Sequence, residues 1–160
     1  MWIILEGPGT IELISGTGGI FVSNKTDKIL KYFEFKYPNV HINVYRSSKD
    51  PEVGRMLRFF NAEGSAALNL DTGEVDIQIN DETFRKSVIY EELAHALQYH
   101  RDGNVEVNSL DYYKREIEVA QCMLDKVASG RLRLKEDEIV QTENNLRVYQ
   151  EAVINLGGAV

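Results

Sequence analysis

Five consecutive residues, Glu91-Glu92-Leu93-Ala94-His95, combine the side-chain types and the spacing of a metal-dependent hydrolytic site. On a helix, residues four apart share a face, so Glu91 and His95 can both reach one ion at about 2 Å from each ligand atom. Glu92 lies one step round the same surface, where its carboxylate can act as a general base. In the common His-Glu-x-x-His arrangement two histidines bind zinc. Glu91 stands here where the first histidine would be, and its negative charge would weaken the Lewis acidity of the ion.

Four segments of the chain together resemble the zincin-like metallopeptidase toxin domains of bacterial polymorphic toxin systems. They cover about the central third of the sequence: residues 61–64, the turn at 71–74, the motif and its continuation at 91–98, and residues 115–120. Such domains lie at the C-terminal tips of large secreted proteins and often carry a Glu-Glu variant of the motif. The resemblance implies a zincin-like fold, a metal ion between two helices, and a cognate immunity protein as partner.

The resemblance also implies a third metal ligand on the helix after the motif, because zincins of the glutamate type take one roughly twenty residues downstream. Glu116 and Glu118 both lie at about that distance from His95. The apolar face of this predicted helix is set by Tyr113, Ile117, Ala120, Leu124 and Val127. Glu116 borders that face, whereas Glu118 is expected to project toward solvent. We therefore predict Glu116 as the third ligand and keep Glu118 as the alternative.

Length, charge and cysteine content narrow the class of protein. With 160 residues and 43% hydrophobic residues, the chain can form one domain over residues 1–160 with a core of its own. A net charge of −7 has the wrong sign for a nucleic-acid partner, so we expect a protein or peptide substrate instead. Cys122 is the only cysteine, which excludes an internal disulfide and a cysteine-based zinc site, and we interpret it as structural.

No apolar run is long enough to span a membrane, so we expect a soluble protein without a membrane partner. Residues 1–22 are rich in apolar side chains but are broken by glycines and lack a basic leader, so no signal peptide is predicted. Export would then need a larger parent chain. If the protein is a toxin, we expect delivery to the cytoplasm of a target cell, which fits a chain without disulfides.

The periodicity of apolar residues predicts an α+β domain in which a small, largely antiparallel sheet carries the motif helix and the C-terminal helices on one side. Strands are predicted at residues 2–5, 10–14, 19–22, 40–45, 66–70 and 75–79. Helices are predicted from 24 to a stop at Pro38, from Asp50-Pro51, from a cap at Asp81 to about 100, at 110–127 and at 136–156, with a turn at Ser129-Gly130 between the last two. The first helix is expected to turn one side inward, with Ile29, Leu30, Tyr32, Phe33 and Phe35, and the second to turn Met56, Leu57 and Phe60 inward. The turn at 71–74 joins the last two strands in a hairpin.

Each candidate residue also has a structural interpretation. The face of Glu91, Glu92 and His95 can be a solvated helix surface. His100 is five residues past His95 and turns away from it, so we expect it at the surface, and His41 on its strand is expected to be structural. The glycine-rich segment 15–19 lacks the Gly-Lys-Ser/Thr ending of a phosphate loop and is predicted as a hairpin turn.

Tyr112 and Tyr113 could supply a hydroxyl to a reacting oxyanion, but core packing explains them equally well.

The leading hypothesis is a zinc-dependent metallopeptidase. Glu91, His95 and Glu116 would hold zinc, Glu92 would activate water, and the hairpin before the motif helix would offer an edge strand to an extended substrate. Another divalent metal stays open because two glutamates and one histidine select zinc less strongly than two histidines and one glutamate. The alternative is a catalytically inactive zincin-like fold that acts as a protein-binding module.

Overall fold

The computed structural model describes the backbone from residue 21 to 160 and side chains from Lys25 onwards. Within this part the elements are α1 (Phe21–Lys36), β1 (Ile42–Arg46), α2 (Pro51–Phe59), β2 (Gly64–Leu68), β3 (Val75–Ile79), α3 (Lys86–Asp102), α4 (Leu110–Ala128) and α5 (Glu136–Asn155). The strands predicted at 2–5 and 10–14 and the turn at 15–19 lie outside the described residues. The strand predicted at 19–22 is wrong at its end, because Phe21 and Val22 begin α1.

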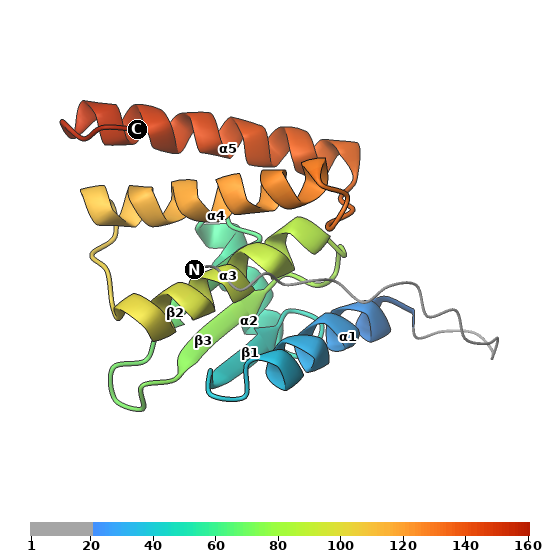
Figure 1. Cartoon of the computed structure of the whole chain (residues 1–160). Helices are drawn as coiled ribbons and strands as arrows, with labels where there is room; N and C mark the ends of the chain where they lie inside the picture. Colours follow the sequence, from blue (N-terminus) through green and yellow to red (C-terminus); the bar gives the residue numbers. More distant parts are fainter. Residues whose placement is uncertain (1–20) are drawn as a thin grey trace.

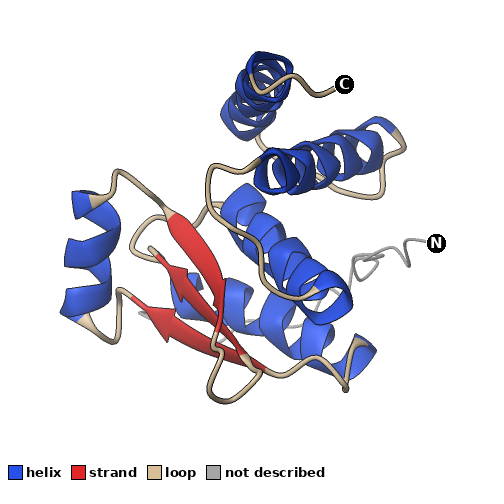
Figure 2. Cartoon of the chain, turned by 90° about the vertical axis from the view of Figure 1, so that its left-hand side faces the viewer, coloured by secondary structure: helices blue, strands red, loops and turns tan. Residues whose placement is uncertain are grey.

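The strands form a mixed sheet in the order β1-β3-β2. β2 pairs with β3 in the predicted antiparallel hairpin, but β1 pairs with β3 in parallel. The predicted α+β class is therefore confirmed, whereas the prediction of a largely antiparallel sheet is wrong, because one of the two strand pairings is parallel. The chain leaves β1 through α2, and the hairpin then brings β3 back alongside β1 in the same direction. Figure 2 also corrects the one-sided arrangement, because α2 lies across the sheet from the other helices.

The hydrophobic core lies between the sheet and α3. On β3, Val75, Ile77 and Ile79 are buried on one side, as their alternation predicts. They join Phe33 of α1 and the apolar face of α3 in one cluster. Burial of each such aliphatic side chain stabilises the fold by about 1.5–3 kcal/mol. This cluster holds α3, the helix that carries the motif, against the sheet.

Three side chains expected to face inward are exposed. In α1, Phe35 is 83% exposed although Leu30 and Phe33 are buried, because a core-facing stripe of this helix is narrower than the predicted one. α2 begins as predicted, with Asp50 accepting from the Glu52 amide at 3.0 Å. Only Leu57 of its predicted inward residues is buried; Met56 lies off the inner stripe, and Phe60 follows the end of the helix.

Asp81 does not cap the motif helix, which begins five residues later at Lys86. Its buried carboxylate instead accepts from Arg46 Nε at 2.7 Å and from the Ser48 amide at 2.8 Å. Burial alone would raise the pKa of Asp81, but the Ser48 hydrogen bonds and the Arg46 guanidinium outweigh it and lower that pKa. This ion pair ties β1 to the segment between β3 and α3.

A carboxylate from α5 accepts hydrogen bonds at the start of α3. Glu138 accepts from the Ser87 amide at 2.9 Å and from the Lys135 amide at 3.0 Å, so one side chain satisfies the first turns of two helices. Burial would raise the pKa of Glu138, but these hydrogen bonds lower it. The start of α5 is thereby held against the start of α3.

α4 and α5 form an antiparallel helical hairpin stacked on α3 (Figure 1). The predicted turn between them is confirmed, with Gly130 in the left-handed region at φ 73°. The predicted bounds of both helices differ from the observed ones by one residue at most. Among residues 21–160 no helix is long and apolar enough to cross a membrane.

Candidate metal centre

Two residues of α3 and one of α4 converge on a single point. Glu91, His95 and Glu116 each offer a ligand atom, and these three atoms lie within 4.8 Å of one another. His95 Nε2 is 3.3 Å from Glu116 Oε2. The convergence follows from the four-residue spacing on α3 and from the packing of α4 against that face. The three residues predicted as metal ligands are thus brought together; that they bind a metal stays a prediction.

The charges at this point are out of balance. Burial raises the pKa of Glu91, and Glu116 and Glu63 raise it further, while His95 offsets part of the rise. Burial alone would lower the pKa of His95, but the hydrogen bond and charge of Glu116 raise it to about 9. His95 is thus paired with the Glu116 carboxylate. The site gathers three carboxyl groups, those of Glu91, Glu92 and Glu116, around a single imidazole ring.

Glu92, the predicted general base, is buried beside the cluster with 7% of its surface exposed. Burial raises its pKa, and the neighbouring Glu91 and Glu116 carboxylates add to the rise. The start of β2 lies directly on it: a Cβ atom at Gly64 would be 2.6 Å from Glu92 Oε1. Only a glycine allows the strand to pass this close to the carboxylate.

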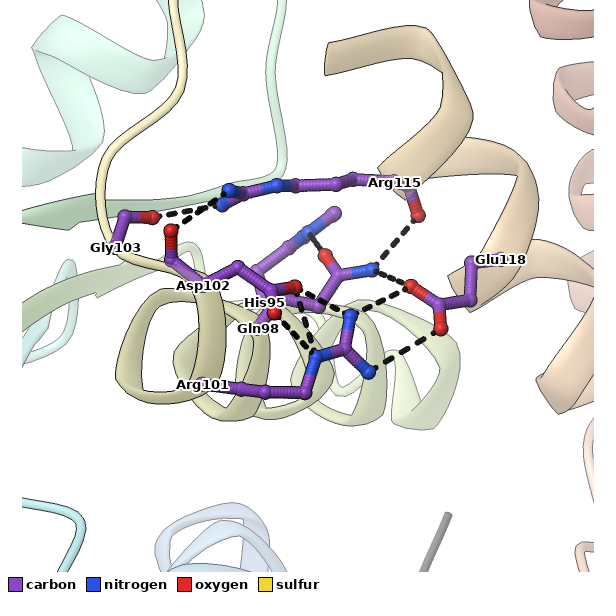
Figure 3. A network of polar contacts seen from close by, with 7 residues as sticks. All are labelled: His95, Gln98, Arg101, Asp102, Gly103, Arg115 and Glu118. Atoms are coloured by element: carbon purple, nitrogen blue, oxygen red, sulfur yellow. Dashed lines mark hydrogen bonds and ion pairs between the residues drawn. The ribbon is translucent and has the colours of Figure 1, made fainter. Parts of the chain in front are cut away.

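Glu118, the alternative third ligand, is engaged elsewhere. Its carboxylate accepts from Gln98 Nε2 at 2.8 Å and from Arg101 at 3.2 Å (Figure 3). It therefore does not join the cluster. Nor does it project freely into solvent, which is the position that its helical phase predicts. His100 is exposed, as expected, and His41 is exposed and does not line the site.

Tyr112 of α4 and Tyr149 of α5 line the cleft beside the cluster. Tyr112 hydrogen-bonds Glu116, and burial together with that carboxylate raises the pKa of its hydroxyl well above the ordinary range. The Tyr112 hydroxyl therefore lies against Glu116, one of the three candidate ligands. Tyr113 instead donates to Asn108 Oδ1 at 3.1 Å, away from the cluster. Tyr149 of α5 is a residue that sequence reasoning missed; burial and the charges of Glu116 and Glu91 raise the pKa of its hydroxyl strongly.

The cluster opens into a cleft of about 590 Å³ between β2, α3 and the helical hairpin. The β2 side supplies Glu63, Gly64, Ser65 and Ala66, and α5 supplies Gln141, Asn145 and Tyr149. The contribution of α5 could not be found from sequence, because its residues are polar positions on a helix far along the chain from the motif. Gln98 was also missed as a contact of His95, although its spacing of three residues on the same helix is a usable signal.

The donor set fits a divalent cation. One imidazole nitrogen and two carboxylate oxygens are the ligand atoms of a three-residue catalytic zinc site, which leaves a fourth position for a reacting group. A cation would also relieve the repulsion among the buried carboxylates. Two carboxylates and a single imidazole leave the choice among zinc and other divalent ions open.

No protein-family model matches the chain, and neither a curated protein nor a solved structure matches it significantly. The resemblance to zincin-like toxin domains therefore stays a prediction drawn from the four sequence segments. The fold itself is described by its own elements, as an α+β domain with a mixed three-stranded sheet.

Proposed function

We propose that the protein is a zinc-dependent hydrolase of the zincin type that cleaves a peptide bond. The observation that carries this proposal is the convergence of Glu91, His95 and Glu116 from two helices, with the Glu92 carboxylate beside them in a cleft. A metal site without a neighbouring base would suit a structural ion equally well. The additional carboxylate of Glu92, which lies directly against Gly64, favours a hydrolytic site.

Glu91, His95 and Glu116 would hold the zinc ion, which would supply Lewis-acid polarisation in the cleft. Glu92 would accept a proton from a water molecule as the hydroxyl oxygen adds to the carbonyl carbon of the peptide bond. The same carboxyl group then gives the proton to the amide nitrogen as the carbon–nitrogen bond breaks. The products are a carboxylic acid and an amine, and Glu92 returns to its starting form. The raised pKa of Glu92 suits both steps, because a more basic carboxylate holds the proton more readily.

The substrate binds, in this proposal, as an extended strand along β2. In the described sheet β2 pairs with β3 on one side only, and Gly64, Ser65 and Ala66 line the cleft on the other. A peptide added here would use main-chain hydrogen bonds, which favours a protein substrate over a small molecule. The net charge of −7 further favours a basic or amphipathic segment.

We further propose that the domain is the toxin part of a bacterial polymorphic toxin. This proposal is supported by the resemblance of the four segments and by a chain that holds no disulfide, which suits action in the cytoplasm of a recipient cell. An immunity protein would then bind over the cleft.

Metal analysis and two substitutions test the proposal. Native protein is expected to carry about one equivalent of zinc by elemental mass spectrometry, and His95→Ala is expected to carry none. Glu92→Gln should keep the metal but abolish hydrolysis of a peptide library or toxicity in a host cell, because it removes the base without changing the side-chain shape. Glu143→Gln, on an exposed face of α5, is the matched control and should behave as native protein. Full activity in Glu92→Gln would refute the assigned role.

A protein-binding module is the second candidate. The favouring observation is the His95–Glu116 ion pair, which gives the buried histidine a partner without any metal. Absence of metal from native protein after reconstitution, together with a partner captured through the cleft, would support this function over hydrolysis.

A further inference from the structure

Gln98 is a wholly buried polar residue with every polar atom of its side chain bonded. It lies on α3, one turn after His95, and is 1% exposed. Its Oε1 is 2.9 Å from His95 Nδ1, and its Nε2 is 3.0 Å from the Arg115 carbonyl oxygen and 2.8 Å from Glu118 Oε2. Because water does not reach this buried amide, its hydrogen bonds must be made to these protein groups, and they determine its orientation.

The orientation of the Gln98 amide follows from its two partners on α4. The Arg115 carbonyl can only accept a hydrogen bond. Glu118 is bound by the Arg101 guanidinium at 3.2 and 3.3 Å, and a carboxylate in such an ion pair accepts hydrogen bonds and donates none. Two acceptors require the two hydrogens of the amide nitrogen, so the amide oxygen must face His95 (Figure 3).

This orientation determines which nitrogen of His95 carries a proton. A carbonyl oxygen only accepts, so His95 Nδ1 must donate to Gln98. The opposite tautomer would place two lone pairs against each other at 2.9 Å in a buried setting. The remaining nitrogen, Nε2, then faces Glu116 at 3.3 Å and is the one free to give its lone pair to an ion.

We propose that Gln98 is the positioning residue that fixes His95 in the Nδ1-protonated form and aims Nε2 at the metal. The metal-binding part of this inference rests on the proposed function, whereas the assignment of the ring proton does not. Outer partners of a ligand histidine commonly change metal affinity 10- to 100-fold when they are removed.

The same contacts make the position of Gln98 depend on α4. Arg101, near the end of α3, binds Glu118, and Glu118 in turn holds the Gln98 amide. The Arg115 side chain adds a second tie, because its guanidinium donates to the Gly103 carbonyl oxygen at 2.8 Å. The end of α3 and the middle of α4 are thus joined by the side chains that orient His95.

The test compares Gln98→Met, which keeps the side-chain length but removes the amide, with native protein. Zinc affinity is measured by competition with a chelator, and the ring nitrogens are followed by long-range proton–nitrogen NMR. His95 is assigned among the three histidines by substitution of the other two. Gln121→Met is the matched control, because Gln121 is exposed on α4 and bonds only to Asp125 among the hydrogen bonds found for its side chain.

A rescue variant separates positioning from packing. In Gln98→Glu combined with Glu118→Gln, residue 98 still accepts from His95 Nδ1 and the new amide at 118 donates to it, while the hydrogen bond to the Arg115 carbonyl oxygen is lost. If the Gln98 side chain only filled space, the buried charge of Gln98→Glu would lower the stability of the protein more than Gln98→Met does.

We expect Gln98→Met to weaken zinc binding about 10- to 100-fold and to lose the His95 Nδ1–H signal. The control and the rescue variant should keep that signal. Native affinity together with an unchanged signal in Gln98→Met would overturn the inference. Should Gln98→Met fail to fold, the rescue variant decides: a retained Nδ1–H signal supports the inference and its loss overturns it. If native protein binds no zinc, the proposed function fails, but the signal in metal-free native and Gln98→Met proteins still decides the role of Gln98.

Discussion

Replacing Gly64 with alanine tests how closely β2 must approach α3. The added Cβ would lie 2.6 Å from Glu92 Oε1, 2.7 Å from Val88 Cγ1 and 2.9 Å from Glu92 Cγ. Val88 and Glu92 are one turn apart on α3, so rotating one side chain leaves the other contact in place. The strand must therefore move away from the helix, and overpacking of this kind costs about 1–3 kcal/mol. For a chain of this length that corresponds to a fall in Tm of roughly 2–12 °C.

Urea unfolding followed by circular dichroism measures this cost, with Gly64→Ala, Val88→Ala and the double variant forming a cycle. Removing the Val88 methyl groups clears one of the two obstacles, so the cost of Gly64→Ala should be smaller in that background by at least about 0.5 kcal/mol. Hydrolytic activity should fall in Gly64→Ala even where the protein remains folded, because Glu92 is displaced. A Gly64→Ala protein as stable as native, or a cost that is equal in both backgrounds, would refute the reasoning.

Three further predictions concern stability. Asp81→Ala should lower the free energy of unfolding by about 1–3 kcal/mol in urea titrations, because the Ser48 amide and Arg46 Nε lose their acceptor while Asp27 still pairs with Arg46. Folding lowers the pKa of Asp81, so the stabilisation that its carboxylate provides is complete above the ordinary pKa of 3.8 and is lost as pH falls through the lowered pKa. Native and Asp81→Asn proteins should therefore converge in stability only below about pH 4. Glu138→Gln should lower Tm, since the Ser87 amide would lose a charged acceptor, and equal Tm values would contradict that role. Zinc at 100 times its Kd should stabilise the native protein by about 2.7 kcal/mol, reversibly with chelator, and no change would count against the metal site.

Elements with strong local signals could be predicted from sequence. The Asp50-Pro51 pair starts α2 because both residues act within one helical turn. The turn at 71–74 similarly forms the hairpin of β2 and β3 because it joins two strands that are adjacent in the sequence. These are interactions between neighbours, which a reading of a single sequence can detect.

Long-range pairing could not be predicted in the same way. Asp81 has the residue type of a helix cap, but its partner Arg46 lies on β1, and no local pattern distinguishes the two uses of a carboxylate. The parallel pairing of β1 with β3 likewise depends on the crossover through α2.

For the candidate site, the spacing of Glu91 and His95, the resemblance that pointed to the following helix, and the helical phase of Glu116 together chose residues that the structure brings into one cluster. The positions of Gln98 and Tyr149 depend on how α4 and α5 dock, which is a property of packing. Sequence therefore indicates the ligand atoms more readily than the residues that orient them.

The division of the candidate ligands between two helices has a kinetic consequence. α4 and α5 pack on each other and on α3, whereas the sheet is covered by α1, α2 and α3. The helical hairpin can therefore open as a local cooperative unit while the sheet and α3 remain folded. Each opening would withdraw Glu116 from Glu91 and His95, so the lifetime of a bound ion would be limited by how often the hairpin detaches. Amide exchange in α4 and the rate of metal release would then report the same motion.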